Sequence, residues 1–354
     1  MFILVFLLLV ISSCAKDSYV WYDGNISEAL SQVSLDSEKI LFLDFYSDNW
    51  GACVRLDAET LSNSQVVSFS KEKMISLKLK PWSVKEDSEL FKSMNGTGLP
   101  LLVYLNSDGE EIDRILGYIS AEEYLNRIED IYNGVNTFLS LKNSFISGSR
   151  DVTVISRLSD KCKSYSDLEF CEDVHAYVIN NRTYFAPQTI FAAELIFAKK
   201  QIEVDGDTSG LIKLINVYKN PEYQKSIYNT LVYHYNSSGD IKAEAKIYKE
   251  YSDKFITDAN LLNGYGWRMT ELQLNLHDAL EKSTLGIDLT SDNPDSQANI
   301  LDTKAELLWL LERYDEAISV IDIAININPN SDYFKEQKTK FQNSKNEEKL
   351  WAQL

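Results

Sequence analysis

The run KILFLDFY, residues 39–46, constrains the fold of this chain more than any other segment. Apolar side chains occupy both faces of an extended chain here, which is the pattern of a strand buried on both sides. Such a strand needs layers of other elements above and below it. The neighbouring sequence meets this need, because strand and helix patterns alternate from about Tyr19 to Tyr132.

The alternation predicts the element order β-α-β-α-β-β-α. Strands are predicted at 39–46, 74–79, 101–105 and 111–116, and helices at 52–61, 65–73, 86–94 and 120–132. Asn106 to Gly109 has the composition of a tight turn. Ser120 is a good N-cap with Glu123 three residues later, which is the pattern of a capping box. We therefore expect a mixed sheet covered by helices.

A single cysteine, Cys53, lies near the start of the helix predicted at 52–61, just after the first strand. A helix N-terminus favours the thiolate form, so redox chemistry is often found at such a position. Thiol-disulfide exchange within one chain also needs a second thiol that resolves the mixed disulfide. Cys53 has no second cysteine near it, since its nearest neighbours of this type in the sequence are Cys14 and Cys162.

The element order and several local motifs closely resemble thioredoxin, in the form found in periplasmic disulfide reductases and isomerases, over about residues 24–133. The motifs are LDFY at 43–46, ETL at 59–61, GLP at 98–100, NSDGEE at 106–111 and GYIS at 117–120. By this resemblance, Pro100 is the cis-proline that faces the active-site turn. Asp44 falls on the buried acid that assists proton transfer there.

The turn of this family reads Trp-Cys-x-x-Cys. An ungapped alignment places Trp50 at the first, nucleophilic cysteine and Cys53 at the second, resolving cysteine. The resemblance therefore implies a redox-inactive domain whose cis-proline region binds an extended peptide by strand addition. The alternative is a thiol-disulfide oxidoreductase or isomerase that acts through Cys53 alone.

The N-terminus, MFILVFLLLVISSC, begins with an apolar stretch that is too short to span a bilayer as a helix. It has the length of a signal-peptide core, and its end, ISSC, resembles the bacterial lipobox. The resemblance implies a signal peptide at residues 1–13, lipidation of Cys14 and a membrane anchor in the cell envelope, facing the periplasm or the exterior. No Lys or Arg precedes the apolar core, so an ordinary signal peptide or a buried N-terminal helix stays an alternative.

Two further cysteines, Cys162 and Cys171, lie nine residues apart in helical stretches around a turn predicted at 164–167. An envelope location permits disulfides. A local disulfide that joins the two helices is one reading. Two buried thiols packed as small apolar groups are the other.

After about Asn133 only amphipathic helices are predicted, at 135–146, 152–164, 166–180 and 187–200. Residues 134–224 are predicted to form either helical hairpins or cryptic repeats. Residues 225–331 resemble tetratricopeptide repeats, with units at about 225–255, 262–289 and 298–331, and a C-terminal helix is expected at 332–354. The units carry small residues where helices cross, because larger side chains would not fit there: Gly266, Ala279, Gly286, Ala305, Ala317 and Ala324. Glu244 replaces an expected alanine.

In this repeat family the first helix of each unit lines a concave face that binds partners. On this chain that face would carry Asn229, Tyr233, Asn299, Asp302, Glu306 and Trp309. The two acidic residues favour a basic or apolar protein segment over a C-terminal carboxylate. The alternative is that these residues form only a solvated face of a scaffold.

The chain carries 53 acidic against 35 basic residues, a net charge of −18 over 354 residues. Such a surface repels polyanions, so nucleic-acid binding is not expected. The three histidines, His175, His234 and His277, are far apart and adjoin no cysteine. We therefore expect no metal site, catalytic triad or cofactor.

Overall fold

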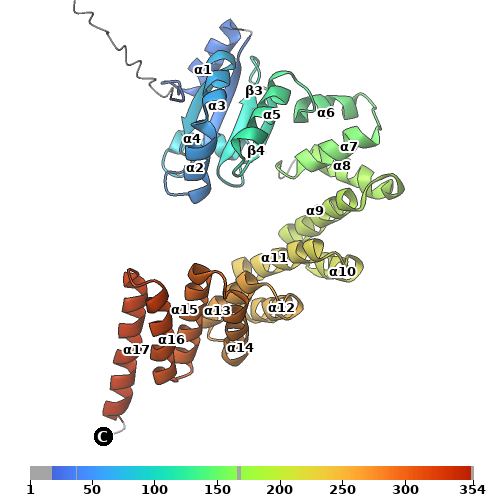
Figure 1. Cartoon of the computed structure of the whole chain (residues 1–354). Helices are drawn as coiled ribbons and strands as arrows, with labels where there is room; N and C mark the ends of the chain where they lie inside the picture. Colours follow the sequence, from blue (N-terminus) through green and yellow to red (C-terminus); the bar gives the residue numbers. More distant parts are fainter. Residues whose placement is uncertain (1–17, 37, 166–168, 352–354) are drawn as a thin grey trace, which may run out of the picture. The chain divides into compact units, whose positions relative to one another are not determined.

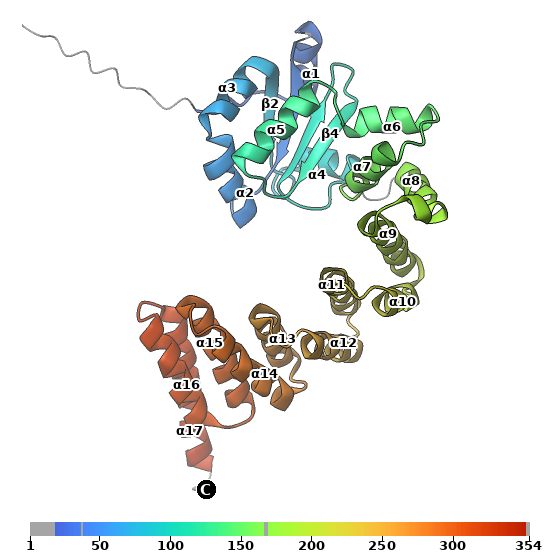
Figure 2. The same cartoon turned by 45° about the vertical axis from the view of Figure 1, so that its right-hand side comes forward.

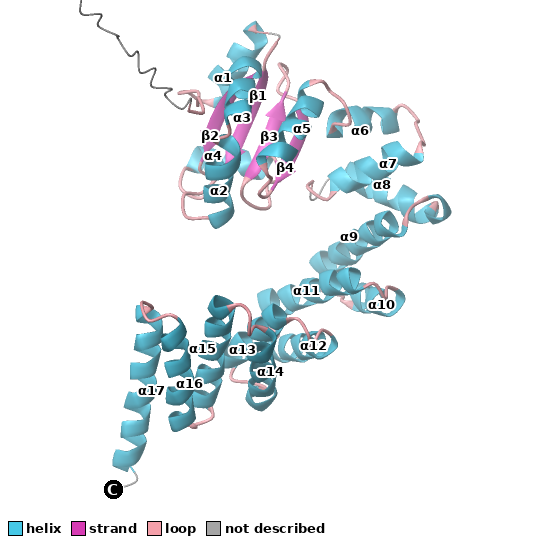
Figure 3. Cartoon of the chain, viewed as in Figure 1, coloured by secondary structure: helices cyan, strands magenta, loops and turns pink. Residues whose placement is uncertain are grey.

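The structure, a computed structural model, describes residues 18–36, 38–165 and 169–351. Cys14 and the predicted signal peptide lie outside the described residues. The chain forms two compact units, residues 1–194 and 195–354, whose boundary falls inside α9, Pro187–Asp205 (Figure 1). Within the described residues, strands occur only between residues 40 and 116 (Figure 3). The expected fold class, an α/β domain followed by a long helical region, is confirmed.

The α/β part of the first unit contains a four-stranded sheet in the order β2-β1-β3-β4. β1 pairs with β2 in parallel, whereas β1 with β3 and β3 with β4 are antiparallel. Its elements are α1 (Ile26–Leu35), β1 (Ile40–Phe45), α2 (Gly51–Leu56), the π-helix η1 (Asp57–Leu61), α3 (Ser64–Lys73), β2 (Met74–Leu79), α4 (Lys85–Ser93), β3 (Leu101–Leu105), β4 (Glu111–Leu116) and α5 (Ala121–Tyr132).

Helix α1 is an addition to the order that the sequence predicts. Its hydrophobic pattern is weak, but a reciprocal cap fixes its start. The Asn25 side chain accepts a hydrogen bond from Glu28 N at 3.0 Å, and the Glu28 carboxylate accepts one from Asn25 N at 3.1 Å. The helix then buries Ala29 and Val33 against the sheet.

Alternation along β1 builds two apolar layers. Phe42 points into one layer, which includes Tyr104 and Tyr124. Leu41, Leu43 and Phe45 point into the other, which includes residues from α1, α2 and α4. Because both faces are covered, the continuous apolar run at 39–46 is explained by burial on both sides.

Both edges of the sheet are protected, which prevents unwanted strand pairing. At the β2 edge, Tyr22 N donates to Ser76 O at 2.7 Å. At the β4 edge, a helical subdomain packs against the strand. This subdomain comprises α6 (Phe138–Ile146), α7 (Val152–Cys162), α8 (Glu169–Asn180), the 3₁₀ turn η2 (Arg182–Tyr184) and the first part of α9.

Arg114, on β4, holds the helical subdomain to the sheet. The residue is only 3% exposed. Its guanidinium donates to both Glu111 carboxylate oxygens at 2.6 Å and to Ser164 O at 3.3 Å. It also lies 4.1 Å from the Tyr165 ring centroid. Beside it, Lys161 forms an ion pair with Asp113.

The second unit is a series of paired helices (Figure 2). After α9 it contains α10 (Ser209–Val217), α11 (Pro221–Ser238), α12 (Ile241–Lys254), α13 (Ala259–Leu272), α14 (Leu276–Leu289), α15 (Pro294–Leu310), α16 (Tyr314–Ile327) and α17 (Asp332–Trp351).

Small residues lie at the helix crossings of this unit. Ala305, Ala317 and Ala324 are fully buried. A Cβ added to Gly266 would meet Ser283 Oγ at 2.6 Å, so the close approach requires glycine.

Glu244, at the expected alanine position, is 1% exposed. It is compensated by Arg268, whose Nε and Nη2 donate to its carboxylate at 2.6 and 3.0 Å. A buried carboxylate is tolerated when such a partner satisfies it.

Candidate functional site

The turn between β1 and α2 places Trp50 and Cys53 in different environments. Trp50 is the N-cap residue of α2, and its side chain is 49% exposed. Its carbonyl accepts hydrogen bonds from Cys53 N at 2.9 Å and Val54 N at 3.1 Å. Cys53 is 2% exposed and packs in the apolar layer with Phe45 and Leu99. The exposed position at the helix start therefore holds an indole, and the thiol faces the core.

Burial raises the pKa of the Cys53 thiol above its usual value. A backbone hydrogen bond from Ser47 acts in the opposite direction, and the carboxylates of Asp44 and Asp57 raise the pKa further. Since the thiolate is the nucleophile in disulfide exchange, this environment lowers the reactivity of Cys53.

Asp44 lies beneath the turn on β1 and is 1% exposed. Neither of its carboxylate oxygens has a hydrogen-bond partner among the described residues. Lys78, its neighbour in register on β2, places Nζ 4.0 Å from Asp44 Oδ2 but 2.6 Å from Asp57 Oδ2. Burial therefore dominates and raises the pKa of Asp44 to about 7, although Lys78 opposes the shift.

The Leu99–Pro100 peptide bond is cis. It precedes β3 at the same end of the sheet as the Trp50 turn, because Phe45 at the end of β1 pairs with Leu101. Pro100 O accepts a hydrogen bond from Gly117 N at 2.8 Å. Within the described residues, the backbone N–H and C=O of Leu99 have no hydrogen-bond partner.

A disulfide joins Cys162 and Cys171 in the helical subdomain. It closes the loop that presents Ser164 and Tyr165 to Arg114. Ser166 and Asp167, the second half of the turn predicted there, lie outside the described residues. Among the described residues, Cys53 is the one free cysteine.

Part of the partner-binding face predicted on the repeats is covered by the chain itself. Asp302 is 5% exposed and Glu306 8% exposed. Lys340 Nζ, on α17, donates to the two Glu306 oxygens at 2.6 and 2.7 Å, and Tyr333 OH donates to Asp302 at 3.2 Å. Desolvation raises the pKa of Asp302 to about 6.

Trp309 also contacts α17. Its Nε1 donates to Ser344 Oγ at 2.9 Å, and Lys340 Nζ lies 3.8 Å from its ring centroid. The open face expected at Asp302, Glu306 and Trp309 is therefore corrected, because α17 occupies it. Asn299, one turn earlier on α15, stays exposed.

Asn229 and Tyr233, predicted on the same face of the first repeat, lie at a groove between α9 and α11. The groove has a volume of about 530 Å³. Tyr233 is 75% exposed. The groove is lined by Lys199, Ile202, Glu203, Ser226, Asn229, Thr230, Tyr233, His234 and Ser237.

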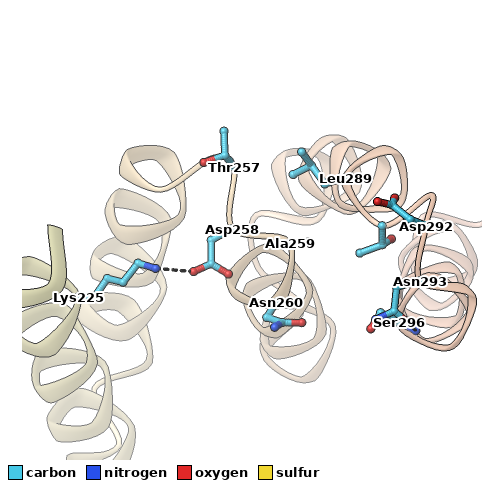
Figure 4. Close-up of a pocket in the computed structure, with 10 residues that line it drawn as sticks. Lys225, Thr257, Asp258, Ala259, Asn260, Leu289, Asp292, Asn293 and Ser296 are labelled. Carbon is cyan, nitrogen blue, oxygen red and sulfur yellow. Dashed lines mark hydrogen bonds and ion pairs between the residues drawn. The ribbon is translucent and has the colours of Figure 1, made fainter.

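A second cavity of about 530 Å³ opens at the N-terminal ends of α13 and α15 (Figure 4). Asp258 caps α13 through Leu261 N at 3.1 Å and binds Lys225 Nζ at 2.8 Å. Asn293 caps α15 through Ser296 N at 3.1 Å. These groups are engaged in holding the helices, so the cavity makes a weaker candidate than the α9–α11 groove.

In the described part of the chain, no group of three or more His, Cys, Asp or Glu side chains is arranged to hold a metal ion. A search of the same residues also finds no helix with the length and apolar composition needed to cross a bilayer.

Comparison with known proteins assigns a family to the α/β part of the first unit. Residues 26–132 match the family model of the thioredoxin-like domain. This segment is a thioredoxin-like domain. Over 105 residues the chain is 30% identical to the thiol:disulfide interchange protein DsbD of Tatumella citrea. That match covers 29% of this chain and 18% of the length of the relative.

Two solved structures are also similar. The oxidised C-terminal domain of DsbD from Neisseria meningitidis is 23% identical, with a TM-score of 0.27, and the match covers 29% of this chain and 90% of that one. A tetratricopeptide (TPR) protein of Thermus thermophilus is 12% identical, with a TM-score of 0.24, and the match covers 62% of this chain and 94% of that one.

Two features near these sites are not predicted from the sequence. Trp82, in the loop after β2 of the thioredoxin-like domain, is 61% exposed and lies beside Trp50. The feature of the sequence that could have indicated an exposed aromatic side chain is a tryptophan in the short segment between Lys80 and Lys85. Lys340 was missed because its role depends on where α17 packs.

Proposed function

We propose that this chain is an envelope-anchored protein that binds a partner polypeptide through its thioredoxin-like domain and its helical repeats, without dithiol redox chemistry. One observation carries the proposal: Trp50 occupies the exposed helix start, where the exchange reaction needs a thiol. Cys53 is buried and has a raised pKa, so it does not replace that thiol.

The peptide-binding part of the proposal rests on backbone and groove geometry. Leu99 offers a backbone N–H and C=O for strand addition at the sheet end that holds Trp50. The α9–α11 groove presents Asn229 and the exposed ring of Tyr233, and aromatic side chains are enriched at protein interfaces. The net charge of −18 favours a basic or apolar partner over an acidic one.

The envelope part of the proposal rests on the lipobox-like ISSC and on the Cys162–Cys171 disulfide, which suits an oxidising compartment. Lipid on Cys14 would then hold the domain at a membrane surface. Mass spectrometry of the mature protein from its native envelope tests this. A mature N-terminus other than an acylated Cys14 would contradict the lipoprotein assignment.

Insulin reduction, coupled to a dithiol reductant, tests the redox part. The natural protein and Cys53→Ser should both be inactive. Trp50→Cys restores the motif Cys-Gly-Ala-Cys at the start of α2, so it should gain measurable reductase activity. Activity of the natural protein that disappears in Cys53→Ser would refute the proposal and favour the single-thiol enzyme.

A further inference from the structure

The first described residues of the chain are fixed to one edge of the sheet. Tyr22 N donates to Ser76 O on β2 at 2.7 Å, and Tyr19 OH lies 3.2 Å from Ser76 Oγ. The ring centroids of Tyr19 and Trp21 lie 4.4 Å apart, and those of the two rings lie 6.3 and 6.1 Å from the Phe42 ring. Because both backbone and side chains make these contacts, the segment is part of the folded domain.

Val20 marks the outer surface of this segment. Its neighbours Tyr19 and Trp21 pack against the apolar layer that contains Phe42, whereas Val20 is 57% exposed. The segment lies beside β2, which is an edge strand in the order β2-β1-β3-β4. The opposite edge strand, β4, is three strands away, which corresponds to about 14 Å across the sheet.

The lipid proposed on Cys14 would be attached very close to this edge. Only Ala15, Lys16 and Asp17, called the tether below, separate Cys14 from Ser18. The Cα atoms of Cys14 and Ser18 are therefore at most about 14 Å apart, even when the chain is fully extended. A folded domain of 100 residues has a radius of gyration of about 13 Å. The tether is thus about as long as the radius of the domain that it holds.

We infer that the edge formed by residues 18–22 and β2 faces the lipid headgroups of the bilayer, and that β4 is directed away from them. The inference rests on the proposed function, because it needs the lipid on Cys14. A domain on so short a tether can tilt, but it cannot turn its point of attachment away from the lipid surface. The net charge of −18 offers no attraction to an anionic bilayer. The length of the tether, rather than surface affinity, therefore holds this edge at the headgroups.

The experiment uses the full mature chain, purified from its native envelope and reconstituted into phosphatidylcholine vesicles whose headgroups carry a nitroxide quencher. Val20→Cys and Leu116→Cys are each labelled with a thiol-reactive fluorophore. Leu116, at the end of β4, is the matched control, because its side chain is 39% exposed. Since the nitroxide quenches only at close range, the label at position 20 should be quenched several-fold more strongly than the label at position 116. The natural protein measures background labelling of Cys53, which is 2% exposed.

A second variant tests whether the tether sets this orientation. Insertion of about 20 Gly and Ser residues between Asp17 and Ser18 adds a flexible segment with a root-mean-square end-to-end distance of about 25 Å. The domain can then leave the surface and turn. The labels at positions 20 and 116 should therefore be quenched equally in the chain with the insertion.

Equal quenching of the two labels in the chain without the insertion would overturn the inference. A difference that the insertion leaves unchanged would also overturn it, because surface affinity would then orient the domain. Flotation of the vesicles on a density gradient separates these results from failure of the proposed function. If the natural protein floats no better than Cys14→Ser, it carries no lipid anchor, and the proposed function fails together with the inference. Far-UV circular dichroism checks the folding of each variant, and Ser18→Cys is the second labelling site if Val20→Cys does not fold.

Discussion

Replacing Arg114 by methionine tests how the helical subdomain is held on the sheet. Methionine keeps an apolar stem but removes the charge. Glu111, whose side chain is 19% exposed, then loses its bidentate partner, and Ser164 O loses a donor. Breaking a buried ion pair from one side costs about 3–5 kcal/mol. We take the lower end because Glu111 is partly solvated, and add about 1 kcal/mol for the lost contact with Tyr165.

Hydrogen exchange of the full chain, followed by mass spectrometry, measures this loss. The resulting cost of about 4 kcal/mol corresponds to exchange that is roughly 1,000-fold faster. The increase should be confined to β4, α7 and α8, whereas peptides from α13 to α16 in the other unit should not change. Arg55→Met is the matched control, because Arg55 and Glu59 form an ion pair with side chains 59% and 51% exposed. Exposed pairs contribute about 0–1 kcal/mol.

Two results would refute this reasoning. If Arg114→Met and Arg55→Met accelerated hydrogen exchange by the same factor, the buried Arg114–Glu111 ion pair would contribute no more to stability than the exposed Arg55–Glu59 pair. Faster exchange throughout both units would show that Arg114 supports the whole chain rather than one subdomain.

Three further predictions concern single sites. The pKa of Asp44 is about 7 in the folded chain, against about 4 when unfolded, so the free energy of unfolding falls as the pH rises through this window. Asp44→Asn should therefore raise the melting temperature at pH 8 and leave it nearly unchanged at pH 4; an equal rise at both would contradict the shift. The Cys162–Cys171 disulfide closes a short loop, with a sequence separation of 9 residues. Its removal in Cys162→Ala/Cys171→Ala should lower the free energy of unfolding of the first unit by about 2–3 kcal/mol. Urea unfolding measures this loss, and an unchanged midpoint would refute the prediction. Ala317→Leu should overpack the α15–α16 crossing and lower stability by about 1–3 kcal/mol, whereas Ser319→Leu, at an exposed position on the same helix, should not.

The sheet could be predicted from the sequence because its strands are short apolar or alternating runs between clear turn signals. The run predicted at 39–46 contains β1, and those predicted at 74–79 and 101–105 coincide with β2 and β3. Helix positions followed from caps and periodicity. Helix α1 was not predicted, because its start depends on Asn25 and Glu28 more than on an apolar face.

The environments of charged residues could not be predicted in the same way. Arg114 lies in the run EIDRIL, where alternation would send a charge to solvent, yet the helical subdomain buries it. Asp302 and Glu306 occupy positions that are open in an isolated repeat, and only the placement of α17 closes them. Burial of a charge depends on partners that are distant in sequence, which a local pattern does not encode.

Helix α17 covers an apolar face of the last repeat, and this affects which contacts between molecules are open to the repeats. Its Phe334 and Phe341 belong to one buried apolar cluster with residues of α15 and α16: Ala298, Leu301, Ala305, Leu308, Ala317, Ile321 and Ala324. In a stack of similar repeats, an uncovered apolar face can accept the leading helix of another molecule, and such head-to-tail contacts form open filaments when their rotation does not close into a ring. Because α17 packs against this apolar face from within the same chain, the face is not open to a repeat of another molecule.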